Sequence, residues 1–228
     1  MLTMTGDAEK FISGGDSLLV KQDIRDYIEQ HILPKYSLFD KAHNVEHVDM
    51  VISNSMSIAK DYRVDINMVY VIAAYHDIGL IQGRYNHEKN SAAFLLSDSK
   101  LKDWFSEDEL RLMSEAVEDH RASCSHEPRN IYGKIVSEAD RDVDYMTVLT
   151  RTIQYSLANS PDYTYEQHFT RSYKHVRDKF GENGYLKLWL DTEVNRKNLQ
   201  LLRTAISSKE TFIADFEKVF LNCSKQVE

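Results

Sequence analysis

The sequence contains little proline, glycine and cysteine, and each shortage excludes a class of protein. Its 228 residues include 3 Pro, 8 Gly and 2 Cys. All-β sandwiches and barrels need a turn about every 8–12 residues, and those turns rely on glycine and proline. Two cysteines without a Cys-x-x-Cys pair do not support a disulfide framework or a thiolate zinc site. The composition therefore favours a mostly helical protein of a reducing compartment.

Long apolar runs and glycine-rich phosphate loops are also missing. The sequence has no stretch of 18 apolar residues, whereas a membrane-spanning helix needs about 20. It contains neither G-x-G-x-x-G nor G-x-x-x-x-G-K, so no Rossmann or P-loop cradle is expected. Residues 1–15 lack a basic segment followed by an apolar run, which predicts a loose leader rather than a signal peptide. We therefore expect a cytoplasmic protein without a membrane partner.

The charge is acidic and unevenly distributed. The chain carries 28 basic and 36 acidic residues, a net charge of −8. Residues 1–140 hold 15 basic and 24 acidic residues, a net −9, while residues 141–228 hold 13 and 12, a net +1. An acidic chain offers no general field for polyanions, so a nucleic-acid strand is not an expected partner.

Apolar residues recur at helical spacing along most of the chain, which predicts an all-α fold in one domain over residues 16–228. The segment 66–78 is apolar nearly all round, which predicts a buried central helix. Asp16 or Ser17 is expected to cap the first helix, and Ser207 with Glu210 the last one. The other expected helices cover about 44–61, 87–96, 107–120, 131–140, 147–158, 164–180, 185–205 and 208–221.

Histidine and aspartate occur together where the chain is most apolar. His76 and Asp77 lie at the C-terminal end of the 66–78 segment. An unpaired ionised carboxylate beside apolar packing is too costly to tolerate, and a divalent cation resolves the cost because imidazole and carboxylate both bind it. The alternative is an exposed helix end, where His76 is favourable beside the negative end of the helix dipole.

Two further residues add to this pair. His47 lies on the expected helix 44–61, and Asp140 closes the apolar run K-I-V-S-E-A-D. Helical bundles build metal sites from side chains on facing helices. His47, His76, Asp77 and Asp140 would therefore form a two-histidine, two-carboxylate pocket in a bundle core.

Three segments occur in a recognisable order: A-H-N-V-E-H-V (42–48), A-A-Y-H-D-I-G (73–79) and K-I-V-S-E-A-D-R-D-V-D (134–144). They resemble the first-histidine helix, the His-Asp doublet and the last-aspartate helix of the HD-domain superfamily of metal-dependent phosphohydrolases. The resemblance covers about residues 36–145. It implies a single-domain helical bundle of HD-domain type with additional C-terminal helices. The implied metal ligands are His47, His76, Asp77 and Asp140.

The resemblance also implies an activity and a cofactor. A metal-activated water would cleave a phosphoester or pyrophosphate bond of a small molecule, with a nucleotide as the favoured substrate. Asp77 would ligate the ion and orient the water, and His87 or His120 would protonate the leaving oxygen, since imidazole titrates near neutral pH. One divalent ion is favoured over two, and Mn, Mg, Zn, Ni, Co and Fe are not distinguished.

A small cationic cluster surrounds the two additional histidines. Arg84 and Lys89 flank His87 at an expected helix start, where N–H groups attract anions. Arg121 follows His120 directly. We expect Arg84, Lys89 and Arg121 to bind the substrate phosphate, with ordinary solvated surface as the alternative for Arg84 and Lys89.

Other features are expected to be less specific. His43 precedes His47 by four residues and is either a helix cap, a supporting group or a contact to metal or substrate. His126 and Cys124 are interpreted as structural or incidental. Leu80 follows the doublet where some cyclic-dinucleotide phosphodiesterases carry Lys, and their Gly-Tyr-Pro segment is absent. No Glu follows the doublet at the short spacing of the nucleotidase-like branch, so neither subfamily is expected.

Two other functions remain open from the sequence. One is a di-iron oxygenase of the same superfamily, in which His87 and His120 supply additional ligands. The other is a non-catalytic, metal-stabilised sensor or binding module. Residues 146–228 match no motif, and the sequence is compatible with a homo-oligomer.

Overall fold

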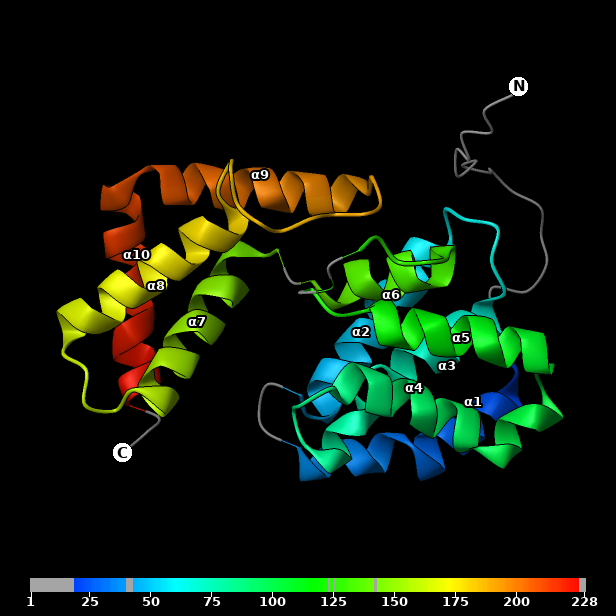
Figure 1. Cartoon of the computed structure of the whole chain (residues 1–228). Coiled ribbons are helices and arrows are strands. Elements are labelled where there is room, and N and C mark those ends of the chain that lie inside the picture. Colours follow the sequence, from blue (N-terminus) through cyan, green and yellow to red (C-terminus); the bar gives the residue numbers. More distant parts are fainter. Residues whose placement is uncertain (1–18, 40–42, 123, 125, 142, 226–228) are drawn as a thin grey trace, which may run out of the picture. The chain divides into compact units, whose positions relative to one another are not determined.

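The chain folds into helices. The computed structural model describes residues 19–39, 43–122, 124, 126–141 and 143–225, and these residues contain no strand, which confirms the all-α prediction (Figure 1). The α-helices are α1 (Gln22–His31), α2 (Val45–Ala59), α3 (Ile66–Tyr75), α4 (His87–Ser97), α5 (Glu107–Asp119), α6 (Ile131–Asp140), α7 (Tyr145–Asn159), α8 (Tyr165–Phe180), α9 (Glu193–Ser207) and α10 (Lys209–Ser224). Short 3-10 helices are η1 (Leu33–Leu38), η2 (Ile78–Gln82) and η3 (Ser99–Asp103). No described helix is both long and apolar enough to cross a membrane.

Contacts within the chain divide it into two compact units, residues 1–141 and 142–228. The first contains α1 to α6 and the second contains α7 to α10. Whether residues 16–228 fold as one domain stays a prediction. The predicted leader over 1–15 and the predicted caps Asp16 and Ser17 lie outside the described residues.

Helix α3 is the central helix of the first unit. It contacts α1, α2, α4, α5 and α6, and every residue from Met68 to Tyr75 is buried. Asp65 caps its start by accepting a hydrogen bond from the backbone N–H of Asn67. The helix ends at Tyr75 rather than at the expected 78, and the chain turns into η2. The buried central helix is confirmed, and its end delivers His76 and Asp77 into the interior.

Tyr36 fixes the end of α3 from η1. Its ring is completely buried, and its hydroxyl donates to the carbonyl oxygen of Ala74 at 2.9 Å. The same hydroxyl accepts from the backbone N–H of Asp77 at 3.3 Å. Tyr36 therefore provides partners for two backbone groups that would otherwise be unsatisfied where the helix stops.

The second unit has a core of its own, in which Leu149, Ile153, Val176, Phe212 and Phe216 are buried together. Helix α9 begins at Glu193, so the expected helix over 185–205 is wrong in its first two turns. The backbone N–H groups of Tyr185 and Leu186 donate to the carbonyls of Asp178 and Lys179 at 3.0 and 2.9 Å. These bonds turn the chain back along the end of α8, which prevents a helical start there.

Two expected helix starts are also corrected. Ser208, not Ser207, caps α10, because its hydroxyl accepts from the backbone N–H of Thr211 at 3.2 Å. The Ser207 hydroxyl instead donates back to the carbonyl of Thr204. At the other end of the chain, α1 begins at Gln22, so Leu19 precedes the helix and is exposed.

Candidate metal centre

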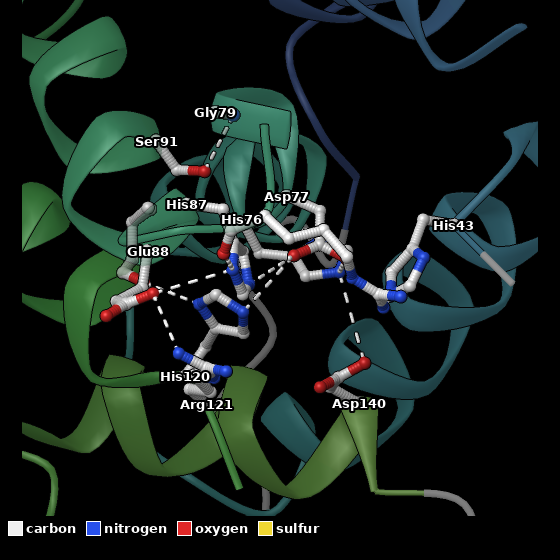
Figure 2. A network of polar contacts seen from close by, with 12 residues as sticks. His43, His76, Asp77, Gly79, His87, Glu88, Ser91, His120, Arg121 and Asp140 are labelled. Atoms are coloured by element: carbon white, nitrogen blue, oxygen red, sulfur yellow. Dashed lines mark hydrogen bonds and ion pairs between the residues drawn. The ribbon is translucent and has the colours of Figure 1, made fainter. Parts of the chain in front are cut away.

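Six side chains from five segments converge inside the first unit, and Figure 2 labels five of them. They are delivered by the first turn of α2, the residues directly after α3, the start of α4, the residue after α5 and the last residue of α6. In chain order these side chains belong to His47, His76, Asp77, His87, His120 and Asp140.

Local structure fixes where two of the helices begin. Asn44 caps α2, since its side-chain oxygen accepts from the backbone N–H of His47 at 3.1 Å. Gly79 packs directly against the first turn of α4, where a Cβ would lie 2.3 Å from the carbonyl oxygen of His87. The backbone N–H of Gly79 donates to the Ser91 hydroxyl at 2.8 Å. This close packing holds α4 against the chain that carries Asp77.

Asp77 is the centre of the cluster. Its Oδ2 lies 3.2 Å from Nε2 of His76 and 3.6 Å from Nε2 of His47. Its Oδ1 lies 3.2 Å from Nε2 of His87 and 3.4 Å from Nε2 of His120. The two carboxylate oxygens therefore face two different pairs of imidazoles, with 3% of the residue exposed.

Asp140 completes one side of this arrangement. Its Oδ1 lies 3.3 Å from Nε2 of His47 and 4.0 Å from Nε2 of His76. Among the described residues, three groups of donor atoms have the spacing of a metal site, and Asp77 belongs to the two that lie in this cluster. These two are His47, His76 and Asp77, and Asp77, His87 and His120.

Backbone carbonyls orient three of the histidine rings. Nδ1 of His76 lies 2.7 Å from the carbonyl oxygen of Ala73, and Nδ1 of His120 lies 2.6 Å from that of Val117. Nδ1 of His87 lies 3.2 Å from the carbonyl of Arg84. Because a carbonyl only accepts, each Nδ1 donates to its carbonyl, and Nε2 of each ring faces Asp77. Metal-binding histidines are oriented in this way.

The donor set fits a divalent cation. Nε2 of His47 lies only 3.2 Å from Nε2 of His76, and both nitrogens face carboxylate oxygens. Lone pairs and anionic oxygens repel one another unless a proton or a cation lies among them. Imidazole nitrogens with carboxylates are ligands that suit Zn, Fe, Mn and related ions.

The electrostatics of the side chains alone indicate the same demand for positive charge. Burial lowers the pKa of His47, but the carboxylates of Asp140 and Asp77 raise it to about 9. Burial likewise opposes protonation of His120, and Asp77 raises its pKa. Although burial favours the neutral acid, His76 and the other imidazoles hold the pKa of Asp77 well below its usual range. The pKa of Asp140 is lowered as well, mainly by His47.

The three predicted substrate residues, Arg84, Lys89 and Arg121, differ in their contacts around this cluster. Nη2 of Arg84 is 3.2 Å from Nε2 of His43, and the ring of His43 contacts that of His47 at 5.8 Å between centroids. Arg121 pairs through Nη1 with Glu88 at 3.4 Å. Lys89 is exposed on α4.

Two supporting residues escaped the sequence argument. Oε2 of Glu88 lies 3.5 Å from Nδ1 of His87, and Tyr36 holds the backbone at Asp77. Glu88 could have been found from its position next to His87 in the sequence. Tyr36 could not, because it lies 41 residues from Asp77. Figure 2 shows Glu88 and His43 on opposite sides of the cluster.

Two further histidines, His126 and His168, do not belong to the cluster. His126 is exposed, and its Nε2 is 3.8 Å from Oδ1 of Asp119. That carboxylate already accepts from Nε and Nη2 of Arg129 at 2.9 Å each. Asp119, which forms a third group of metal-ligand spacing with Cys124 and His126, is therefore already paired with a guanidinium. His168 is buried in the second unit against the Ser156 hydroxyl.

Comparison with known proteins identifies the segment that carries the centre. No curated protein and no solved structure matches the chain significantly. The family model of the HD domain matches residues 44–143, a range that includes all six converging side chains. Over residues 44–143 the chain is therefore similar to the HD domain, whose superfamily is of metal-dependent hydrolase type.

Proposed function

We propose that this protein is a metal-dependent phosphohydrolase that cleaves a phosphoester or pyrophosphate bond of a small molecule, with a nucleotide as the favoured substrate. The observation that carries the proposal is the convergence of four Nε2 atoms on the Asp77 carboxylate within the HD domain. The net −9 charge of residues 1–140 favours a small substrate over a nucleic-acid strand.

The same geometry supports two ions, although the sequence favoured one. His47, His76 and Asp140 lie on the Oδ2 side of Asp77, and His87 and His120 lie on the Oδ1 side. Asp77 would thus be shared by both ions. When bound, such ions polarise phosphoryl oxygens and lower the pKa of a water molecule.

The protein's own groups supply the remaining functions. Asp77 stays ionised at neutral pH because its pKa is held well below the usual range. His87 and His120 act as ligands through Nε2 in this assignment, rather than as proton donors to the leaving oxygen. Glu88 orients His87. Arg84 and Arg121, from two sides of the cluster, are the candidates to bind phosphoryl oxygens.

Two other functions predict different properties of the purified protein. A di-iron oxygenase would use the second ligand group, Asp77, His87 and His120, and would contain iron with a visible absorption spectrum. A sensor module would bind metal and release no phosphate from any substrate. Metal analysis followed by a phosphate-release screen of nucleotides with Mn, Mg, Zn, Ni, Co and Fe separates the three.

Asp77→Asn tests the proposal. The amide keeps the shape of the side chain but removes the charge that both ligand groups share, so we expect metal content and phosphate release to fall more than about 100-fold. His31→Gln removes a histidine from the exposed face of α1 and should change neither. Full turnover in Asp77→Asn would contradict the proposal.

A further inference from the structure

A cavity of about 1100 Å³ is lined by residues of the second unit, none of which is a candidate metal ligand. Its walls come from α8, the turn after it, α9 and the first residue of α10. Small-molecule sites have volumes of about 300–1,000 Å³, so the cavity is large enough for a ligand of nucleotide size.

Cations predominate on its walls although the chain is acidic. Four basic side chains, Lys174, Arg177, Arg203 and Lys209, line the cavity with two acidic ones, Asp178 and Glu182. Lys174 is paired with Asp178 one helical turn away. Nε of Arg203 donates to the carbonyl of Phe180 at 3.1 Å, which orients this half-buried guanidinium. A wall with this excess of positive charge suits an anion.

Aromatic rings lie beside these cations. The rings of Phe169 and Tyr173 are stacked 5.8 Å apart at 12°, and the Arg177 guanidinium lies 5.4 Å from the Tyr173 centroid. Tyr185 also lines the cavity, with 58% of its surface exposed. Its backbone N–H is held by the Asp178 carbonyl, so a fixed chain segment presents an uncovered ring. Planar ligands stack on such rings.

Arg203 extends the same surface into a second hollow. It also lines a cavity of about 550 Å³, together with Trp189 and Arg196. The oriented guanidinium of Arg203 therefore lines both spaces.

We propose that this cavity is a second ligand site, which binds an anionic small molecule with a planar ring, of nucleotide size. Arg177, Arg203 and Lys209 contact the anionic group, and Tyr185 stacks on the ring. All of these residues belong to residues 142–228 and none is a candidate metal ligand, so this proposal does not rest on the phosphohydrolase proposal.

Titration calorimetry of the full chain with ATP in EDTA tests this proposal, in an Asp77→Asn background so that the metal centre does not contribute. We expect Arg177→Gln and Lys209→Gln each to weaken ATP binding about tenfold, and Tyr185→Leu about fivefold or more. Lys197→Gln removes the same charge from an exposed position on α9 that lines neither cavity, and should change the affinity less than twofold. Tripolyphosphate and adenosine should each bind more weakly than ATP.

Several results would overturn the proposal. They are absence of ATP binding, equal weakening by Lys197→Gln and Arg177→Gln, or tripolyphosphate binding as tightly as ATP with no effect of Tyr185→Leu. Arg203→Gln also removes the bond to Phe180, so it is interpreted only alongside Arg177→Gln and Lys209→Gln, which remove no such bond to a backbone carbonyl. Thermal unfolding of each variant confirms that it is folded.

Discussion

Asp77 can serve two pairs of histidines because it leaves the helix that carries it. His76, one residue earlier, is completely buried and hydrogen-bonded to the preceding turn of α3. Asp77 has φ −112° and ψ 5°, outside helical geometry. Its carboxylate consequently lies between α2 on one side and α4 and α5 on the other, where a single side chain meets both sets of imidazoles.

The raised pKa of His47 predicts a pH-dependent stability in the presence of a chelator. The pKa is about 9 in the folded protein against about 6.5 in the unfolded chain. A group whose pKa is raised by folding contributes its full stabilisation below the pKa of the unfolded chain. This stabilisation is lost as the pH rises through the pKa of the folded protein. We therefore compare the unfolding free energies of wild type and His47→Gln. The excess of wild type over the variant should fall by up to about 3 kcal/mol between pH 6.5 and 9. Urea unfolding in EDTA measures this difference, and a constant difference would contradict the prediction.

Tyr36→Phe tests the hydroxyl that closes α3. Its removal leaves the Ala74 carbonyl and the Asp77 N–H without their partner, so we expect a loss of about 1–3 kcal/mol in urea unfolding. Since Asp77 would be less firmly oriented, metal affinity should also fall about tenfold. Tyr85→Phe changes an exposed ring and serves as the control. Unchanged metal affinity with lowered stability would show that Tyr36 is structural only.

At the scale of elements, the contact between η2 and α4 creates the second ligand group. Gly79 is the contact point, where the backbone of α4 leaves no space for a side chain. The turn before α4 is made by Gly83 with φ 100° and Asn86 with φ 54°, both left-handed. The chain thereby reverses within a few residues. This reversal brings His87 back to the carboxylate of Asp77, ten residues earlier in the sequence.

Gly79→Ala and Gly83→Ala separate packing from backbone strain. A Cβ at Gly79 would lie 2.4 Å from the Ser91 backbone nitrogen, whereas a Cβ at Gly83 meets nothing within 4 Å. We expect Gly79→Ala to cost at least about 1–3 kcal/mol and to displace His87, reducing bound metal from two ions toward one. Gly83→Ala should cost about 1 kcal/mol, from its left-handed backbone alone, and retain both ions. Urea unfolding and metal analysis measure the two effects, and equal metal loss in both variants would contradict this assignment.

At the scale of the whole molecule, the uneven charge matches the two units. The unit with the metal centre, residues 1–141, holds 16 basic and 24 acidic residues, a net −8, while residues 142–228 hold 12 of each and carry no net charge. Asp77 and Asp140 are part of that negative charge and are buried where a cation would neutralise it. In the second unit, basic side chains instead gather around the cavity.

Metal binding should stabilise the two units unequally. A ligand that binds only the folded state stabilises the part of the protein that holds it. All candidate ligands lie between His47 and Asp140, so hydrogen exchange should slow in α2 to α6 when Mn or Zn is added, and remain unchanged in α7 to α10. Asp77→Asn should show no slowing. Equal protection of α7 to α10 would instead indicate that the two units unfold together.

The periodicity of the sequence was sufficient for most helices and for the buried helix α3, because burial of a continuous apolar face requires little information beyond spacing. It failed at 185–192, where hydrogen bonds to the end of α8 override the apolar pattern. It also placed the α10 cap one residue early, since Ser207 and Ser208 both have the required hydroxyl and only the backbone path selects between them.

The sequence by itself determined the all-α class and pointed to His47, His76, Asp77 and Asp140, because a His-Asp doublet beside apolar packing favours a cation, and the resemblance to the HD domain added His87 and His120. Only the tertiary structure decided how they are shared. Asp77 faces two histidine pairs because α3 stops at Tyr75 and Gly79 admits α4 closely. The cavity likewise depends on residues that are unremarkable in sequence and become neighbours only when α8 packs beside α9.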